Sequence, residues 1–199
     1  MKKQFIFASN NKNKAEEIRS VLGDEFRIIT LKEAGIHIDI PEPYFTLEEN
    51  AAHKARTIFQ LTGENCFSED SGLEIEALGG RPGVHSARYS GAEANSESNM
   101  QKVLSELSEI ENRKAQFKTV IFLILNEKEY HFEGICTGII AKEKAGEKGF
   151  GYDPIFIPDG NTKTFAEMDM TEKNKYSHRK KATAKLIEFL NQETSHEKK

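Results

Sequence analysis

The sequence predicts a mixed α/β fold in which helices lie on both sides of a mixed β-sheet. Three observations predict it. A short apolar strand, a polar loop and an amphipathic helix open the chain and lead into a second strand. Two long apolar segments in the second half are joined by a tight turn, which is typical of a hairpin. Helical periodicity recurs between and after these strands. A βαβ beginning combined with a hairpin makes the sheet mixed rather than purely parallel.

Four strands and two helices are expected in the N-terminal part of the chain. The strands are short apolar or alternating segments: residues 4–9, 26–30, 36–40 and 65–68. The first helix covers residues 14–22 and is ended by Gly23. The second begins at Thr46, which together with Glu49 has the spacing of a capping box. The last of these strands places Asp70 at a strand end, where a turn begins.

A helix, a hairpin and a final helix are expected in the C-terminal part. Asn95 or Ser96 caps the first of these helices. The hairpin pairs residues 116–125 with 129–141, and the final helix covers residues 177–190. We therefore expect a single domain of residues 1–191 with two lobes. Residues 192–199 are expected to form a disordered tail.

Composition and charge exclude several classes of protein. The 199 residues are 37% hydrophobic, which is too apolar for a disordered chain. The longest apolar run, residues 120–125, is too short to cross a membrane. Cys66 and Cys136 lack the spacing of a metal pair or a disulfide framework, and no signal-peptide core follows the N-terminus. We therefore expect a cytoplasmic protein, and the net charge of -4 argues against a nucleic-acid binder.

The charges are segregated along the chain. Residues 33–80 contain ten acids and two bases, whereas residues 1–14 contain four lysines and no acid. Six further bases, and no acid, lie between Glu172 and Glu188. If these segments converge, they would form a metal-assisted phosphate site. Separate solvated faces are the alternative.

The loop after the first strand is suited to bind phosphate. Free backbone N–H groups and the positive end of the helix dipole point outward there, and Lys14 adds a charge. The spacing is not that of a P-loop, and an ordinary helix cap is the alternative. The candidate residues of this loop are Ser9, Asn10, Asn11, Lys12, Asn13 and Lys14.

A set of acids is suited to bind a divalent cation. Mg²⁺ takes one or two carboxylates from a protein, while phosphate and water supply its other ligands. Adjacent carboxylates repel each other, so one of Glu69 and Asp70 can hold a raised pKa and act as a base. Alternatively, Glu49 only caps its helix and Asp70 only shapes a turn. The candidate acids are Glu42, Glu49, Glu69 and Asp70.

Two further segments are suited to contact a nucleobase. The segment Gly149–Pro154 combines two glycines, which permit close approach of a ligand, with two aromatic rings that can stack on a base. His178 and Arg179 stand at a helix start, where they can donate hydrogen bonds to a keto oxygen or a phosphate. A glycine-rich turn and a solvated basic helix face are the alternatives.

Together, and in this order, these segments resemble the inosine triphosphate pyrophosphatase family, whose members hydrolyse ITP, dITP and XTP. The resemblance extends from residue 9 to residue 179. The motifs that carry it are Ser9-x-Asn11-x-x-Lys14, Glu49-Asn50-Ala51, Lys54-Ala55-Arg56, Glu69-Asp70-Ser71-Gly72-Leu73, Leu78-Gly79-Gly80-x-Pro82-Gly83, Ser86-Ala87-Arg88-Tyr89-Ser90-Gly91, Gly149-Phe150-Gly151-Tyr152-Asp153-Pro154, Glu172-Lys173 and Ser177-His178-Arg179.

The resemblance implies an elongated, two-lobed fold with a central cleft, a homodimer, Mg²⁺ as cofactor and the reaction NTP + H₂O → NMP + PPi. It implies that Asp70 is the proton acceptor and that Glu42, Glu69 and Asp70 bind the metal. Residues 9–14 would hold the triphosphate, and Ser71 would contact the substrate. The implied base pocket consists of Phe150, Gly151, Tyr152, Asp153, Lys173, His178 and Arg179.

Other functions stay open from sequence alone. One is a related pyrophosphatase that acts on other modified nucleotides, such as modified pyrimidines. Another is a nucleotide-binding regulator without catalysis, and a third is a metal-dependent nuclease, for which the sequence lacks a continuous basic groove. A panel of nucleotide and oligonucleotide substrates separates these functions.

Overall fold

The computed structural model describes residues 3–22, 26–92 and 95–196, and the chain divides into two compact units. The first unit consists of Met1–Asp70, Thr119–Gly134 and Arg179–Lys199. The second consists of Ser71–Lys118 and Ile135–His178. Each unit has its own apolar core.

The strands form one mixed sheet of six strands in the order β2-β1-β3-β4-β5-β6. Strand β1 pairs in parallel with β2 and with β3, whereas β5 and β6 are antiparallel. The strand bounds are β1 Lys3–Phe7, β2 Phe26–Thr30, β3 Cys66–Ile75, β4 Lys114–Leu125, β5 Lys128–Ile140 and β6 Phe156–Pro158. The mixed α/β class that the sequence predicts is confirmed.

Helices begin and end where local signals place them. The α-helices of the described residues are α1 Lys12–Arg19, α2 Leu47–Thr62, α3 Ser96–Glu106, α4 Met170–Lys173 and α5 His178–His196. Short 3₁₀ helices cover Glu76–Leu78, Gly83–Arg88, Asp153–Ile155 and Phe165–Glu167. Thr46 Oγ1 accepts a hydrogen bond from the Glu49 N–H, and Gly63 ends the helix with φ 69°. Asn95 caps α3 through the Ser98 N–H.

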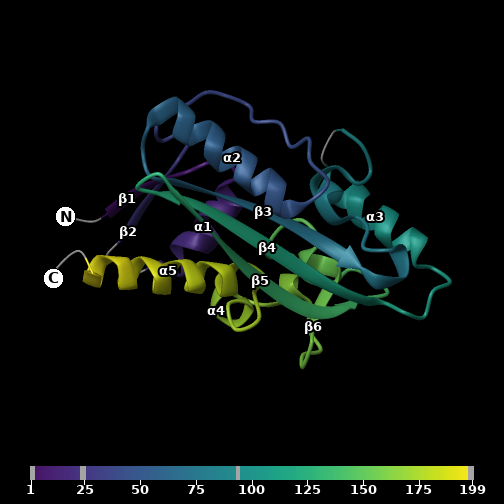
Figure 1. Ribbon diagram of the computed structural model, residues 1–199. Coiled ribbons are helices and arrows are strands. Elements are labelled where there is room, and N and C mark those ends of the chain that lie inside the picture. The colour runs from purple at the N-terminus through teal and green to yellow at the C-terminus, as the bar shows by residue number, and fades with distance from the viewer. Residues whose placement is uncertain (1–2, 23–25, 93–94, 197–199) are drawn as a thin grey trace. The chain divides into compact units, whose positions relative to one another are not determined.

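Alternation along the strands builds the core of the first unit. Phe5 and Phe7 of β1 pack into one apolar cluster, whereas Ile6 between them packs into another. The first cluster includes residues of α1 and α5, and the second includes residues of α2. Within this unit α2 therefore covers one sheet face while α1 and α5 cover the other, as the ribbon shows (Figure 1). The expected helices on both sides of the sheet are thus present.

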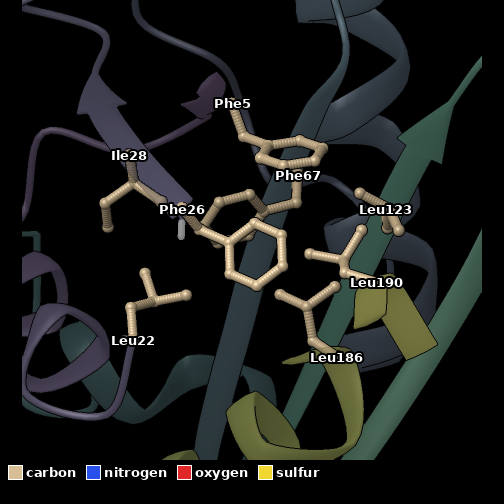
Figure 2. A pocket seen from close by; sticks show the side chains of 8 residues that line it. All are labelled: Phe5, Leu22, Phe26, Ile28, Phe67, Leu123, Leu186 and Leu190. Atoms are coloured by element: carbon tan, nitrogen blue, oxygen red, sulfur yellow. The ribbon is translucent and has the colours of Figure 1, made fainter. Parts of the chain in front are cut away.

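The first cluster contains a small cavity of about 10 Å³ (Figure 2). Figure 2 shows that the side chains around it are all apolar and come from the strands, α5 and the segment after α1. Phe5, Phe26 and Phe67 supply the aromatic rings. A cavity with this lining offers no polar partner to a water molecule or a phosphate. It is a packing feature, and the polar chemistry of the unit lies elsewhere.

Aromatic rings dominate the core of the second unit. Phe117 packs edge-on against Phe156 at a centroid distance of 4.7 Å and stacks with Phe165 at 6.1 Å. Both geometries are favourable for ring quadrupoles. The apolar face of α3 packs into the same cluster through Met100 and Val103. This core supports the loop at 149–154 and the segment that leads to α5.

Several element boundaries differ from the sequence-based expectations. The segment 36–40 is not a strand: Ile36 and Ile40 pack against an apolar cluster without ladder hydrogen bonds, and Ile38 is exposed. Helix α1 begins at Lys12 and ends at Arg19, earlier than expected, and Gly23 lies outside the described residues. Strand β6 has three residues, and the sequence analysis did not predict it.

Two further differences concern the ends of long elements. Strand β3 was expected to stop at Ser68 but continues to Ile75, so Asp70 lies inside a strand and not at its end. Helix α5 continues to His196, so residues 192–196 are helical where a tail was expected, and 197–199 lie outside the described residues.

The hairpin is confirmed: Asn126 and Glu127 have φ of 50° and 65°, as a two-residue turn requires. Within the described ranges, no helix combines the length and the apolar character needed to span a membrane.

Candidate active site

The loop between β1 and α1 is organised by hydrogen bonds of its own side chains. Ser9 Oγ accepts from the Asn11 N–H at 3.1 Å, and Asn11 Oδ1 accepts from the Lys14 N–H at 3.1 Å. Asn11 is therefore the N-cap of α1, and Lys14 stands in the first turn of the helix. This geometry keeps the positive end of the helix dipole and the Lys14 ammonium on the same side of the loop.

Asn10 has a different role in this loop. Its side-chain oxygen accepts a hydrogen bond from the backbone N–H of Lys32 at 2.8 Å, which ties the loop to the turn after β2. Lys12 and Asn13 are exposed in the first turn of α1. Of the six residues expected to hold a triphosphate, Lys14 is the one that contacts the acidic residues described next.

Three of the expected residues meet around Lys54, a residue that sequence analysis did not assign. The Lys54 ammonium donates to Glu42 Oε1 at 2.6 Å, to Asp70 Oδ1 at 3.0 Å and to the backbone carbonyl of Glu69 at 2.9 Å. Lys54 is only 7% exposed and Asp70 only 6%. The position of Lys54 on the inward face of α2, between Ala51 and Ile58, is the signal that could have found it, because a lysine on a buried helix face needs a partner.

Burial and charge act in opposite directions on this pair. Burial is the largest influence on Asp70 and raises its pKa, while the nearby Lys54 and Lys14 ammonium groups lower it and Glu42 adds to the rise. Burial alone would lower the pKa of Lys54, but the charges of Asp70 and Glu42 outweigh it and hold that pKa above its usual value. Lys54 therefore stays charged, and Asp70 is a stronger base than a solvated aspartate.

Glu69 belongs to a second cluster around Arg179. The Arg179 guanidinium donates from Nε to Glu69 Oε2 at 2.7 Å and from Nη2 to Glu69 Oε1 at 2.9 Å, and it also contacts Glu17. The Lys14 ammonium lies 3.3 Å from Glu69 Oε1. The side chains of Arg179 and Glu69 are 3% and 0% exposed, so this bidentate pair is fully buried.

The two clusters bring together charges from three distant parts of the sequence. Lys14 comes from the basic N-terminal segment, Glu69 and Asp70 from the acidic segment, and Arg179 from the basic C-terminal segment. All of them lie in the first unit. Glu17 was also missed by sequence analysis; its only signal was a place on the inward side of α1, one residue before Ile18.

The donor set around Lys54 fits a hard divalent cation. Two carboxylates and a backbone carbonyl already converge on one cationic group there. Mg²⁺ needs only one or two protein carboxylates, because water and phosphate complete its six ligands. Within the described residues, no group of three or more His, Cys, Asp or Glu side chains is arranged to hold a metal ion. Glu69 fits less well as a ligand, since Arg179 binds both of its carboxylate oxygens.

In the second unit, three of the residues expected around a base come together. The Lys173 ammonium lies 2.7 Å from Asp153 Oδ2 and 5.3 Å from the centres of the Phe150 and Phe165 rings. Asp153 Oδ2 also accepts from the Phe150 N–H at 2.9 Å. Asp153 and Lys173 are buried, so the carboxylate fixes both the lysine and the backbone of the loop.

The other expected residues of this unit have varied environments. Tyr152 is 5% exposed and donates its hydroxyl to the Ser86 carbonyl at 2.7 Å, so its ring belongs to the core. His178 stacks on Phe117 with a centroid distance of 4.6 Å and an interplanar angle of 10°. Gly151 has φ 61°, and nothing lies within 4 Å of the position that a Cβ would take there. Ser71 is a half-buried residue of β3.

The chain is similar over almost its whole length to known proteins. Residues 5–189 match the Ham1 family. The chain is 52% identical over 187 residues to a dITP/XTP pyrophosphatase of Flavobacterium psychrophilum, covering 94% of this chain and 98% of that protein. It is 43% identical over 192 residues to a dITP/XTP pyrophosphatase of Bacillus subtilis, covering 94% and 97% of the two chains.

Solved structures agree with these sequence comparisons. A Ham1 protein from Staphylococcus aureus superimposes with a TM-score of 0.87 at 36% identity, covering 96% of this chain and all of that one. A HAM1 protein from Coxiella burnetii superimposes with a TM-score of 0.88 at 39% identity, covering 96% and 99% of the two chains. The resemblance carried by the sequence motifs is thereby confirmed, and the chain belongs to the Ham1 family.

Proposed function

We propose that this protein is a Mg²⁺-dependent nucleoside-triphosphate pyrophosphatase. Its substrates would be purine nucleotides with a non-standard 6-keto base, namely dITP, ITP and XTP, and its products the monophosphate and pyrophosphate. The observation that carries the proposal is a buried carboxylate, Asp70, that accepts a hydrogen bond from Lys54. Asp70 also feels the charge of Lys14, which stands in the first turn of a helix suited to phosphate. The relatives named dITP/XTP pyrophosphatase, which match over most of their length, support it.

The phosphate end of the substrate would bind at the start of α1. Lys14 supplies a partly exposed ammonium group, with 18% of its side chain accessible, and Glu69 holds that group in place. The Asn11 cap fixes the first turn, so the free N–H groups of that turn point in one direction. A triphosphate is a polyanion, and a helix N-terminus with a lysine in its first turn is a favourable place for it.

Asp70 would act as the proton acceptor. A water oxygen forms a bond to the α-phosphorus, the bond from that phosphorus to the oxygen bridging it to the β-phosphorus breaks, and the water proton passes to the Asp70 carboxylate. The pair of electrons of the broken bond leaves on pyrophosphate. Burial raises the pKa of Asp70, which makes its carboxylate a better base than one in water.

Glu42 and Asp70 would hold the metal ion. When bound there, Mg²⁺ would neutralise the charge that develops on the phosphate oxygens. Glu69 would act instead through its pairing with Lys14 and Arg179, because both of its oxygens are bound by the guanidinium. This assignment gives the two adjacent acids of β3 different tasks.

Residues of the segments 149–154 and 173–178 would recognise the base. Inosine and xanthine carry a keto acceptor where adenine carries an amino donor, so a donor facing position 6 favours the former. Lys173 and His178 are the candidate donors, and Phe150 is the candidate stacking ring. Asp153 fixes Lys173 beside the face of Phe150, which supports this assignment. A buried donor left unpaired by adenine would give discrimination on the order of 10⁴.

Pyrophosphate release from a substrate panel tests the proposal. The panel contains dITP, XTP, dATP and dGTP, each measured with Mg²⁺ and with EDTA. We expect rapid release of pyrophosphate from dITP and XTP only with Mg²⁺. Hydrolysis in H₂¹⁸O should place the label in the monophosphate, because water attacks the α-phosphorus. Equal hydrolysis of dATP and dITP, or release of orthophosphate, would contradict the proposal.

The family resemblance further favours a homodimer in the cytoplasm. The mass of the protein in solution, measured by light scattering during gel filtration, tests the first part. We expect about twice the chain mass of 22.5 kDa.

A further inference from the structure

Lys54 occupies the point at which the carboxylates of the proposed metal site converge. Its ammonium group has three N–H donors, and three acceptors lie within hydrogen-bond distance: Glu42 Oε1 at 2.6 Å, Glu69 O at 2.9 Å and Asp70 Oδ1 at 3.0 Å. The residue is 7% exposed. A buried cation of the protein itself is thus already paired with the oxygens that a metal ion would need.

The charges around this group hold it in place. Glu42 and Asp70 each place a carboxylate oxygen within 3.0 Å of the Lys54 ammonium, and the side chains of Lys54 and Asp70 are both 8% exposed. In return, the ammonium neutralises carboxylates that would otherwise repel each other in a buried position. Lys14, in the neighbouring cluster around Arg179, is the natural comparison, because it bears the same charge but pairs with Glu69 Oε1 at 3.3 Å.

We propose that Lys54 is a built-in competitor of the metal ion. Its ammonium group must leave the Glu42 and Asp70 carboxylates before a metal ion can bind them. Lys54 cannot keep its contacts with both carboxylates while a second cation binds the same oxygens, since two cations at that distance repel strongly. The displaced ammonium would then pair with a phosphate oxygen of the substrate. This inference rests on the proposed function, which places the metal ion and a polyphosphate at these residues.

An order of binding follows from this competition. Without nucleotide, a divalent cation must displace Lys54 into a place with no new partner, so binding of the metal alone is weak. With nucleotide, the phosphate supplies that partner, so metal and nucleotide each strengthen the binding of the other. Lys54 would thereby restrict loading of the site to the metal–nucleotide complex.

Binding of Mn²⁺ alone to the nucleotide-free protein tests the inference. Titration calorimetry compares the wild type with Lys54→Met, Lys54→Gln and the matched control Lys14→Met. We expect both Lys54 variants to bind Mn²⁺ at least about tenfold more tightly than the wild type, because the competing charge is gone. Lys14→Met removes one positive charge from the neighbouring cluster but leaves the Glu42 and Asp70 contacts of Lys54 intact, so the Mn²⁺ affinity of this variant should change less than about threefold.

Two outcomes would overturn the inference. One is Mn²⁺ binding by the Lys54 variants that equals or is weaker than that of the wild type. The other is an equal gain for Lys14→Met, which would reveal a general charge effect. Thermal melting checks that each variant is folded. If Lys54→Met does not fold, the Mn²⁺ affinity of Lys54→Gln decides, since the glutamine amide can still donate a hydrogen bond to Asp70. The assay needs no turnover, so a protein that fails to hydrolyse dITP would refute the proposed function without deciding this result.

Discussion

The Arg179 guanidinium binds Glu69 through two hydrogen bonds, from Nε to Oε2 at 2.7 Å and from Nη2 to Oε1 at 2.9 Å. Both side chains are buried, and Glu17 contacts the same guanidinium. This arrangement gives Arg179 a task within the first unit, namely to fix the carboxylate that in turn holds Lys14. The family resemblance had placed Arg179 in the base pocket, and the two roles lead to different expectations.

Substitution of Arg179 should therefore lower activity equally for every base. Arg179→Lys keeps the charge but loses the paired hydrogen bonds, so kcat/KM should fall for dITP, XTP and dGTP by the same factor. Arg179→Met removes the guanidinium that binds two buried carboxylates, Glu69 and Glu17, and should destabilise the fold by about 3–5 kcal/mol. Steady-state rates and thermal unfolding measure the two effects. A changed ratio between dITP and dGTP for Arg179→Lys would favour the base-pocket role.

Gly149 should be more sensitive to substitution than Gly160, although both have similar backbone angles. Their φ values are 74° and 77°, so an alanine at either position should cost about 1–2 kcal/mol of strain. An added Cβ at Gly149 would overlap Asp153 Oδ2, whereas nothing lies within 4 Å of one at Gly160. Gly149→Ala should thus lose about 1–3 kcal/mol more stability.

The same pair of variants also tests the role of Asp153. Because Gly149→Ala displaces the carboxylate that fixes Lys173, it should raise KM for dITP, and the control Gly160→Ala should not. Equal KM values in the two variants would show that the Asp153–Lys173 pair has no part in substrate binding.

Thr183 carries a buried hydroxyl that costs stability. Among the described residues, no hydrogen-bond partner faces its Oγ1, and the residue is 0% exposed. Thr183→Val replaces the hydroxyl with a methyl group of the same shape and should be neutral or stabilise the protein by up to about 1 kcal/mol. Thr183→Ser keeps the hydroxyl and removes a methyl group, so it should destabilise by about 1 kcal/mol. Denaturant unfolding measures both, and a large loss for the valine variant would reveal a hidden partner.

The raised pKa of Asp70 predicts the pH dependence of stability. A carboxyl group whose pKa is higher in the folded state binds its proton more tightly there, so its contribution to stability is present at low pH and is lost as pH rises. The free energy of unfolding of the wild type, relative to that of Asp70→Asn, should therefore decrease as the pH rises from 3.8, the ordinary pKa of an aspartate, to the raised pKa of Asp70. Above that pH the difference should stay constant. A difference that increases with pH would mean that Lys54 and Lys14 outweigh burial.

Elements governed by local signals were predicted well from the sequence. The bounds of β2 agree at both ends, and α2 begins at the predicted capping box. The turn at Asn126 and Glu127 lies where the hairpin was expected. Caps and tight turns depend on neighbouring residues, and so they can be read from a short stretch of chain.

Strand β3 shows why other features could not be predicted. Glu69 and Asp70 would normally end a buried strand, because an unpaired charge in the core is costly. Lys54 lies 16 residues from Asp70 in the sequence and Arg179 lies 110 residues from Glu69, and only the folded chain brings these partners together. The same separation hid the roles of Lys54 and Glu17: Lys54 stands in a motif of the family resemblance to which no role was assigned, and Glu17 stands in no motif.

The rate of pyrophosphate release from dITP by the wild type and by Asp70→Asn tests the central claim most directly. Asparagine can still accept a hydrogen bond from Lys54 but cannot take a proton from water. We expect the variant to stay folded, with kcat reduced by about 10²- to 10⁴-fold. Turnover by Asp70→Asn close to that of the wild type would contradict the account, because the proton would then have to pass to another group.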